Sequence, residues 1–327
     1  MSPRRTIRET VKNGINSIPE LQASLLTAIQ LEFSTIPPYL CAQWSVNDSG
    51  APGSVSYSIG NVAIQEMGHF GQVCNLYTAT GASLKGEIAT PDLVPVYPTV
   101  GLPGGVHPGL VVALAPLGDQ ALRTFMAIEY PEKGPVVPPP PDAPPPPPPP
   151  AEPTIGQFYD AISTGFETVF PTGSLPQYPA PNQVSYADLL SAVNTVADAV
   201  NAISEITAQG EGTSASPDEG TFDPDTLAHY YTFAEIYYGR TIVEVGSGFE
   251  YSGAIIQRPA VYDFSPHQPG APGQDEFIDT FTQLLRNLEA CWTDGSDIGE
   301  QLAAMNSLQS AGTVLIKNGF APQFTFA

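Results

Sequence analysis

Cysteine, basic residues and long apolar runs are all scarce in this sequence. The 3 cysteines are scattered and include no CxxC pair, which argues against a disulfide framework and favours a reducing, cytoplasmic location. No apolar stretch approaches the roughly 20 residues that a transmembrane helix needs. The stretch MSPRRTIRETVKNG is polar and basic, and it lacks the apolar core of a secretory signal. We therefore expect no membrane partner.

The shortage of basic residues leaves the chain strongly acidic. Lysine and arginine total 11 against 33 aspartates and glutamates, so the formal net charge is −22. Such a chain repels phosphate backbones, and we expect no nucleic-acid partner. The GxSxG, Walker A and GxGxxG patterns are also missing, so hydrolase and nucleotide-binding functions have no support.

What the sequence does contain is a set of helical patterns around a sizeable apolar fraction. Hydrophobic residues make up 42% of the chain, enough for a large core. We predict an all-α fold: a four-helix bundle within residues 1–245 and a C-terminal helical extension, 246–327, packed on it. The bundle helices are expected at 17–45, 55–80, 184–211 and 225–241, shorter helices at 118–130 and 154–170, and the final pair at 274–292 and 297–317. Pro37-Pro38 should kink or interrupt the first helix.

Two long irregular segments stand out in this chain of 36 prolines and 30 glycines. Residues 82–125 read as a long ordered loop with a short strand or two near Val111, and loops of this length are often functional. We expect His107, within this loop, to be exposed. Residues 135–153 favour polyproline II and are interpreted as an exposed spacer loop, the alternative being a ligand for an aromatic-grooved module.

Metal-type residues interrupt the apolar stripes of the first two helices. Glu66 and His69 share a face with Ile59, Val62 and Val73, and a carboxylate in such a stripe is costly unless something compensates it. A metal ion bound by the Glu-x-x-His pair would do so. Glu32 falls on the apolar face of the first helix, and the short turn between the helices brings it to the height of Glu66.

The later helices add two more candidates. Glu211 aligns with Val200 on the inward stripe of 184–211, whereas Glu205 falls on the polar face. In the next helix His229 shares a face with Phe233, Ile236 and Arg240, and Glu235 lies off that line. Arg240 could hold a substrate carboxylate or balance a buried glutamate. The predicted metal ligands are therefore Glu32, Glu66, His69, Glu211 and His229.

Five segments of the chain resemble a known family. The segments LLTAIQLEFSTIPPYL, AIQEMGHFGQVCNLYTATG, TIGQFYDAI, AQGEG and AHYYTFAEIYYGR resemble the ferritin-like domain of the VioB type, named for an iminophenyl-pyruvate dimer synthase. The resemblance covers residues 20–245 and implies a ferritin-like bundle with long inserted loops. In its named member it implies oxidative coupling of amino-acid-derived imines. One departure matters: the usual second Glu-x-x-His pair has Thr226 where a glutamate is expected, which leaves the ligand set one carboxylate short.

These patterns together predict a non-haem iron oxidoreductase. The cofactor would be one iron ion, or an unequal pair completed by water or Glu235, with another divalent transition metal as a variant. The expected partners are dioxygen and a small aromatic or amino-acid-derived substrate, and a homo-oligomer is compatible with the sequence. The alternative is a metal-binding or scaffold protein of the same fold without turnover.

Overall fold

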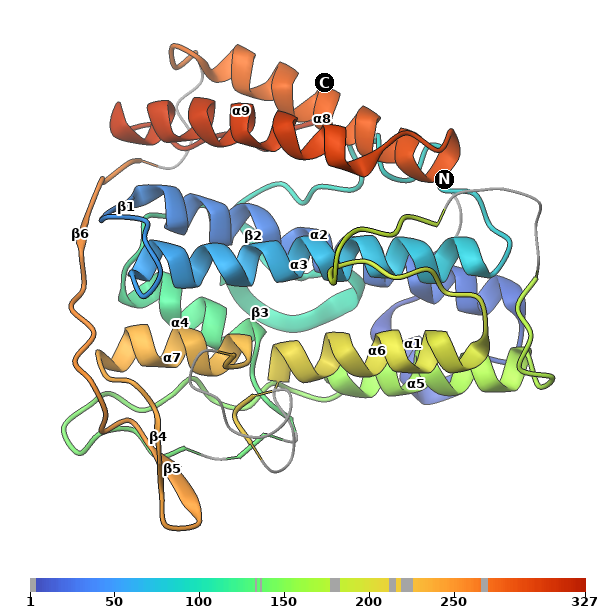
Figure 1. The fold of residues 1–327 in the computed structure, drawn as a ribbon, viewed down its shortest axis with the longest axis horizontal. Coiled ribbons are helices and arrows are strands. Elements are labelled where there is room, and N and C mark those ends of the chain that lie inside the picture. The colour runs from blue at the N-terminus through green and yellow to red at the C-terminus, as the bar shows by residue number, and fades with distance from the viewer. Residues whose placement is uncertain are drawn as a thin grey trace.

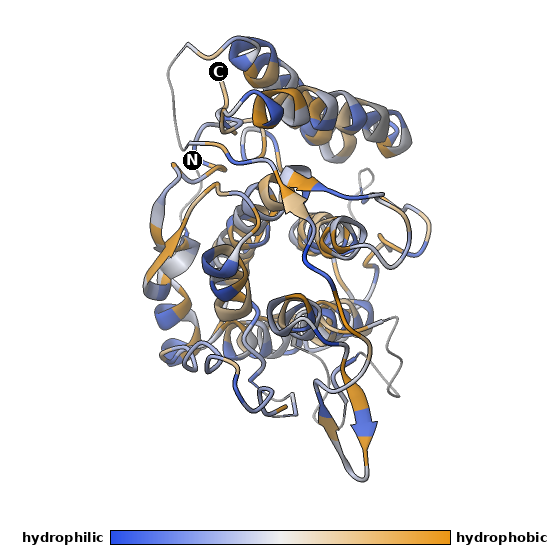
Figure 2. Cartoon of the chain, turned by 90° about the vertical axis from the view of Figure 1, so that its left-hand side faces the viewer, coloured by the Kyte–Doolittle hydropathy of each residue, from blue (hydrophilic) through white to orange (hydrophobic). Residues whose placement is uncertain are grey.

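The computed structural model describes residues 4–132, 134–135, 137–176, 183–211, 216–218, 226–265 and 270–327, without the side chains of residues 211, 302 and 303. Its helices form three layers (Figure 1). Helices α8 (Gln274–Thr293) and α9 (Ile298–Lys317) form the first layer, and α2 (Ile18–Ser45) and α3 (Val55–Ala79) the second. Figure 2 shows the first layer lying over the rest of the molecule. The predicted all-α architecture is confirmed, and the boundary at residue 245 stays a prediction.

The middle layer is buried on both faces, and its composition reflects that position. Most of α2 is buried from Leu21 to Ser45, and α3 is buried over much of Val55 to Ala79. A helix covered on both sides needs apolar or small residues all round, so its polar residues stand out against the pattern. Of the helices in the described residues, none is long and apolar enough to cross a membrane.

The expected interruption at Pro37-Pro38 does not occur, because both prolines lie inside α2. Proline has no amide hydrogen, so the carbonyl of Ser34, one turn before Pro38, loses its usual helical donor. The hydroxyl of Tyr97 donates to that carbonyl at 2.7 Å. The long loop after α3 therefore supplies one of the two hydrogen bonds that the prolines remove.

The third layer consists of two helical rows, each interrupted midway. Helix α4 (Asp119–Ile128) packs against α7 (His229–Tyr238), and α5 (Ile155–Val169) packs against α6 (Val196–Glu211). In Figure 1, α6 and α7 lie end to end beneath α3. In the bundle, α4 and α5 thus form one row and α6 and α7 form the other. The sequence pattern instead predicted that the third and fourth bundle helices are 184–211 and 225–241.

The prediction of a helix over 184–211 is wrong for its first part. Residues 184–193 run in an irregular path along α3, where amide side chains replace helical hydrogen bonds. Gln72 exchanges two hydrogen bonds with the backbone of Ser191, both 3.0 Å, and Asn75 exchanges two with the backbone of Val184, at 2.8 and 2.9 Å. Asp198 and Thr195 then form a cap at the start of α6.

The remaining elements are short. Helix α1 (Ile7–Asn13) precedes the bundle, and the strands β2 (Thr99–Leu102) and β3 (Val106–Val112) form an antiparallel hairpin through the 3-10 turn η1 (Pro103–Gly105). Strand β1 (Val46–Asn47) pairs with β6 (Ala260–Val261), and β4 (Val243–Val245) pairs with β5 (Gly248–Glu250). The hairpin confirms the expected strands near Val111.

Candidate metal centre

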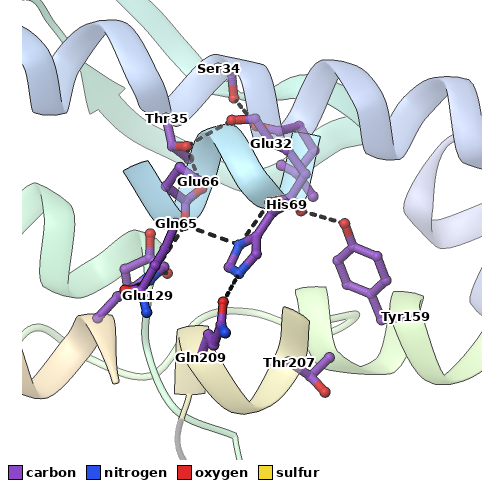
Figure 3. A network of polar contacts seen from close by, with 12 residues as sticks. Glu32, Ser34, Thr35, Gln65, Glu66, His69, Glu129, Tyr159, Thr207 and Gln209 are labelled. Atoms are coloured by element: carbon purple, nitrogen blue, oxygen red, sulfur yellow. Dashed lines mark hydrogen bonds and ion pairs between the residues drawn. The ribbon is translucent and has the colours of Figure 1, made fainter. Parts of the chain in front are cut away.

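Two groups of ligand-type side chains meet between the second and third layers. Glu32, Glu66 and His69 form one group, and Glu66, Glu129 and His229 form the other, with their ligand atoms within 4.8 Å of one another in each. Figure 3 shows side chains from α2 and α3 converging on the first group. All five side chains are 0–9% exposed, so none of the charges is solvated by bulk water.

Glu66 is the residue that the two groups share. Its Oε1 lies 3.4 Å from Nδ1 of His69 and 2.8 Å from Nδ1 of His229, and its Oε2 accepts a 2.6 Å hydrogen bond from the hydroxyl of Thr35. One oxygen therefore sits between two imidazoles while the other is fixed by α2. Glu66 is thus held in contact with both groups.

The outer carboxylates repeat one another on either side of Glu66. Oε2 of Glu32 lies 3.5 Å from Nδ1 of His69, and its Oε1 accepts a hydrogen bond from the hydroxyl of Tyr159. Oε2 of Glu129 lies 3.5 Å from Nδ1 of His229, and its Oε1 accepts from the hydroxyl of Tyr39. Each half of the centre thus contains a carboxylate, an imidazole and a tyrosine.

The imidazoles are oriented by a matching pair of amides. Nε2 of His69 lies 2.8 Å from Oε1 of Gln209, and Nε2 of His229 lies 3.1 Å from Oε1 of Gln65. Because an amide oxygen only accepts, each Nε2 carries its hydrogen when it makes this bond. In the neutral form of each ring this tautomer leaves Nδ1 with a lone pair directed at the carboxylates, as in histidines that ligate metals.

Burial and mutual charge set the protonation of these side chains when no cation is bound. Burial lowers the pKa of His229, but the adjacent Glu129 and Glu66 outweigh it and raise that pKa to about 9. For Glu66, burial opposes ionisation, yet the adjacent imidazoles of His229 and His69 hold its pKa well below the usual range. Burial and the charge of Glu66 raise the pKa of Glu129. Protons on the imidazoles therefore neutralise part of the negative charge of the carboxylates when no cation is bound.

One buried nitrogen without a hydrogen bond supports the fit of these residues to a metal ion. Nδ1 of His229 is fully buried and makes no hydrogen bond of acceptable geometry, although Oε1 of Glu66 lies 2.8 Å away. Buried polar atoms are nearly always satisfied, so an orphaned imidazole nitrogen facing carboxylates needs an explanation. A cation held by the same groups provides one, and carboxylate with imidazole is a donor set that suits iron.

The centre lines a cavity of about 50 Å³ between the second and third layers. His107 is half-buried and lines this cavity, so the prediction that it is exposed is wrong. It bonds to the backbone of Ile128, and burial lowers its pKa. Its φ of 46° lies in the left-handed region, which few residues other than glycine adopt.

The polyproline segment also reaches the cavity. Pro150 is among its lining residues, Pro147 is buried, and Arg123 of α4 donates to the carbonyl of Pro145 at 2.7 Å. The interpretation of 135–153 as an exposed spacer is therefore wrong for its last part, which packs over the third layer and helps to cover the centre.

The remaining candidates from the sequence have different outcomes in the structure. Glu211 ends α6, so the helix does continue through Gly210, but the Glu211 side chain lies outside the described part and its role as a ligand stays a prediction. Glu205 is exposed, as expected for the polar face. Glu235 is not a member of either group: its Oε1 accepts from the amide of Ile242 at 2.6 Å. Arg240 is exposed and donates to the carbonyl of Gly253, away from the cavity.

The ligand-type residue that the pattern missed is Glu129. It follows the last residue of α4 as the helix cap, and it takes the place of the carboxylate that Thr226 leaves missing. His229 is the first residue of α7, so both come from the interruption of a row. The string IEYPE around Glu129 was a usable signal, because a carboxylate beside an apolar helix end requires a partner.

This fold and this centre define the class of protein. The chain belongs to the ferritin-like family, whose sequence model, described as Ferritin-like, matches residues 25–238. A solved structure of a ferritin-like protein from Caulobacter vibrioides is similar, with a TM-score of 0.66, 22% identity, and coverage of 95% of this chain and 99% of that chain. At that identity the likeness shows the fold alone. Comparison with curated proteins gives no match, and the narrower VioB-type resemblance stays a prediction.

Proposed function

We propose that this protein is a non-haem iron oxidoreductase with a dinuclear centre bound by Glu32, Glu66, His69, Glu129 and His229. The observation that carries the proposal is the shared position of Glu66 between two equivalent sets of carboxylate and imidazole. The earlier expectation of one ion or an unequal pair arose from a missing carboxylate, and Glu129 supplies it. Bound there, two iron ions would supply dioxygen binding and redox chemistry.

The surrounding residues would keep the ligands in place. Tyr159 and Tyr39 each hold one oxygen of an outer carboxylate, which leaves the other oxygen directed at the histidines. Gln209 and Gln65 keep Nδ1 of both imidazoles unprotonated once the centre is loaded. Thr35 fixes the shared carboxylate. These contacts orient the ligand atoms before a metal ion binds.

The cavity limits what reaches the centre. A volume of about 50 Å³ accommodates dioxygen or a few water molecules, so an organic substrate would lie at the mouth. His107, Tyr130, Thr154 and Pro150 line the cavity beside the ligand-type residues. The sequence resemblance supports a small aromatic or amino-acid-derived substrate there, and the half-buried Tyr130 offers an aromatic surface for it.

Metal analysis with oxygen uptake tests the proposal. The protein is loaded with ferrous iron without oxygen, desalted, and assayed for iron, and we expect about two equivalents per chain. Oxygen uptake is then followed with and without aromatic amino acids and their oxo-acid and imino-acid forms. Less than about a tenth of an equivalent of metal would refute the site. Iron binding with uptake that no candidate substrate accelerates would favour the non-catalytic metal-binding alternative.

A further inference from the structure

A second cavity lies on the far side of the middle layer. It has a volume of about 430 Å³, is partly open to solvent, and lies between α2–α3 and α8–α9 with residues 186–190 along one side. Its inner wall includes Phe33, Ile36, Phe70, Leu285 and Trp292. Small-molecule sites commonly measure about 300–1,000 Å³ and are lined mainly by apolar and aromatic groups. This cavity meets both criteria, whereas the cavity at the metal centre is several times smaller.

The two cavities use opposite faces of the same helices. On α2, Glu32 and Thr35 line the metal cavity, while Phe33 and Ile36 line the apolar one. On α3, Glu66 and His69 alternate in the same way with residues that face α8 and α9. The helices themselves form the wall, so a molecule in the apolar cavity does not contact the ligand-type side chains.

Water is a poor occupant of this space. A buried water molecule needs about 2–4 polar partners, and the inner wall offers side chains with almost none. Of the two indole nitrogens in the lining, that of Trp292 already donates to Asn75 at 2.9 Å. Apolar surface costs free energy while it faces water, so an apolar wall of this extent favours an apolar occupant.

The shape of the cavity indicates an extended ligand. Its lining runs along α2 from Phe33 to Trp44 and along α8 from Phe281 to Trp292, and these helices lie roughly parallel in Figure 1. At a rise of roughly 1.5 Å per residue, each stretch is about 16 Å long. That length suits a medium-length alkyl chain rather than a single compact ring.

The polar side chains of the lining indicate an uncharged head group. Gln43, Asn306 and Gln309 are the amide side chains in the lining, and the described lining residues include no lysine or arginine. A carboxylate or phosphate would enter without a counter-ion, which is costly, and the net charge of −22 adds repulsion. Met67 and Met305, both half-buried in the lining, adapt readily to different chains.

We propose that the cavity between α2–α3 and α8–α9 binds a neutral molecule with a medium-length alkyl chain, such as a fatty alcohol or amide, separately from the metal centre. The proposal does not depend on the activity of that centre.

Intrinsic fluorescence gives a readout that is specific for this cavity. The chain has 2 tryptophans, Trp44 and Trp292, and both line it. A terminally brominated dodecanol, which quenches tryptophan on contact, is titrated below its micelle concentration into delipidated protein. We expect saturable quenching of most of the emission. The matching bromododecanoate should bind at least about tenfold more weakly, because its charge is unpaired in the cavity.

Variants that fill the cavity complete the test. Leu288→Phe, in the half-buried lining, should weaken binding of the alcohol at least about tenfold because the added ring occupies the site. Leu110→Phe, at a half-buried position of β3 outside the lining, is the matched control and should bind as the parent does. Iron content should be unchanged in both. Ala63→Leu is an independent filling variant in case Leu288→Phe folds poorly, which circular dichroism reports.

Three results would overturn the proposal. Quenching that is absent or rises linearly with probe means that the cavity is not a binding site. Saturable quenching that both filling variants retain places the probe elsewhere on the protein. Equal affinity for the alcohol and the carboxylate refutes the neutral head group.

Discussion

Glu32 and Glu129 make the same pair of contacts from opposite sides of Glu66. Each accepts a tyrosine hydroxyl on Oε1 and places Oε2 at 3.5 Å from Nδ1 of a histidine. One glutamate lies in the middle of α2 and the other caps the end of α4, so the equivalence arises from the assembled bundle. A centre built from two like halves with one shared member predicts unequal effects when the members are substituted.

Substitution of the shared glutamate should remove more metal than substitution of an outer one. In Glu66→Gln a neutral amide replaces the carboxylate common to both groups, so we expect bound iron to fall from about two equivalents to less than about 0.2. Glu129→Gln affects one half and should retain about one equivalent. Elemental analysis after anaerobic loading measures both. Glu235→Gln is the control at normal loading, and equal losses in all three variants would contradict the shared position.

Loss of a tyrosine hydroxyl should weaken metal binding without removing a ligand. Tyr159→Phe and Tyr39→Phe each free one carboxylate oxygen that a hydroxyl now holds. Residues that orient metal ligands typically contribute about 10–100-fold to affinity, and we expect a loss in that range for each variant. Competition with a coloured chelator measures it. The control is Tyr57→Phe on the exposed face of α3, and affinities equal to that control would show that the tyrosines do not orient the ligands.

The sequence predicted the half of the centre that belongs to uninterrupted helices. Glu32, Glu66 and His69 lie in the middle of α2 and α3, where a count of 3.6 residues per turn assigns faces correctly. Glu129 was missed by this count because it follows the last residue of α4, a helix of 10 residues, and the count assigns no face beyond a helix end. His229 was found although it begins α7, since its apolar neighbours follow it in the same helix.

Contacts between distant segments explain most of the differences in the fold. Residues 184–193 carry an apolar pattern compatible with a helix, but Gln72 and Asn75 of α3 hold their backbone in an irregular path. Tyr97 likewise sustains α2 at Pro38, from a loop that no local pattern connects with that proline. Neither partner can be identified from the segment it stabilises. Local signals such as Thr195 and Asp198, by contrast, mark the true start of α6.

Close packing at Gly312 should make the C-terminal layer sensitive to one methyl group. A Cβ added there would lie 2.3 Å from Cζ3 of Trp44 and 3.2 Å from Phe277, both rigid rings in the core. We expect Gly312→Ala to destabilise the protein by about 1–3 kcal/mol through overpacking. Urea unfolding followed by circular dichroism measures the change. Gly248→Ala meets no atom within 4 Å and is the control, so equal destabilisation of the two variants would contradict this contact.

Glu235 should make the stability of the fold depend on pH. Burial raises its pKa from 4.5 to about 7, against the opposing effect of the hydrogen bond from the Ile242 amide. The folded state therefore binds this proton more tightly than the unfolded state, and the resulting stabilisation is complete below pH 4.5 and lost as pH rises through 7.

Glu235→Gln keeps an acceptor for Ile242 and removes the titration. Because the side chain is partly exposed, we expect the variant to exceed the parent by about 1–3 kcal/mol at pH 8 and to match it near pH 4.5. Urea unfolding of both proteins at the two pH values, at constant ionic strength, measures this. A difference of the same size at both would show that the ionisation of Glu235 is not its source.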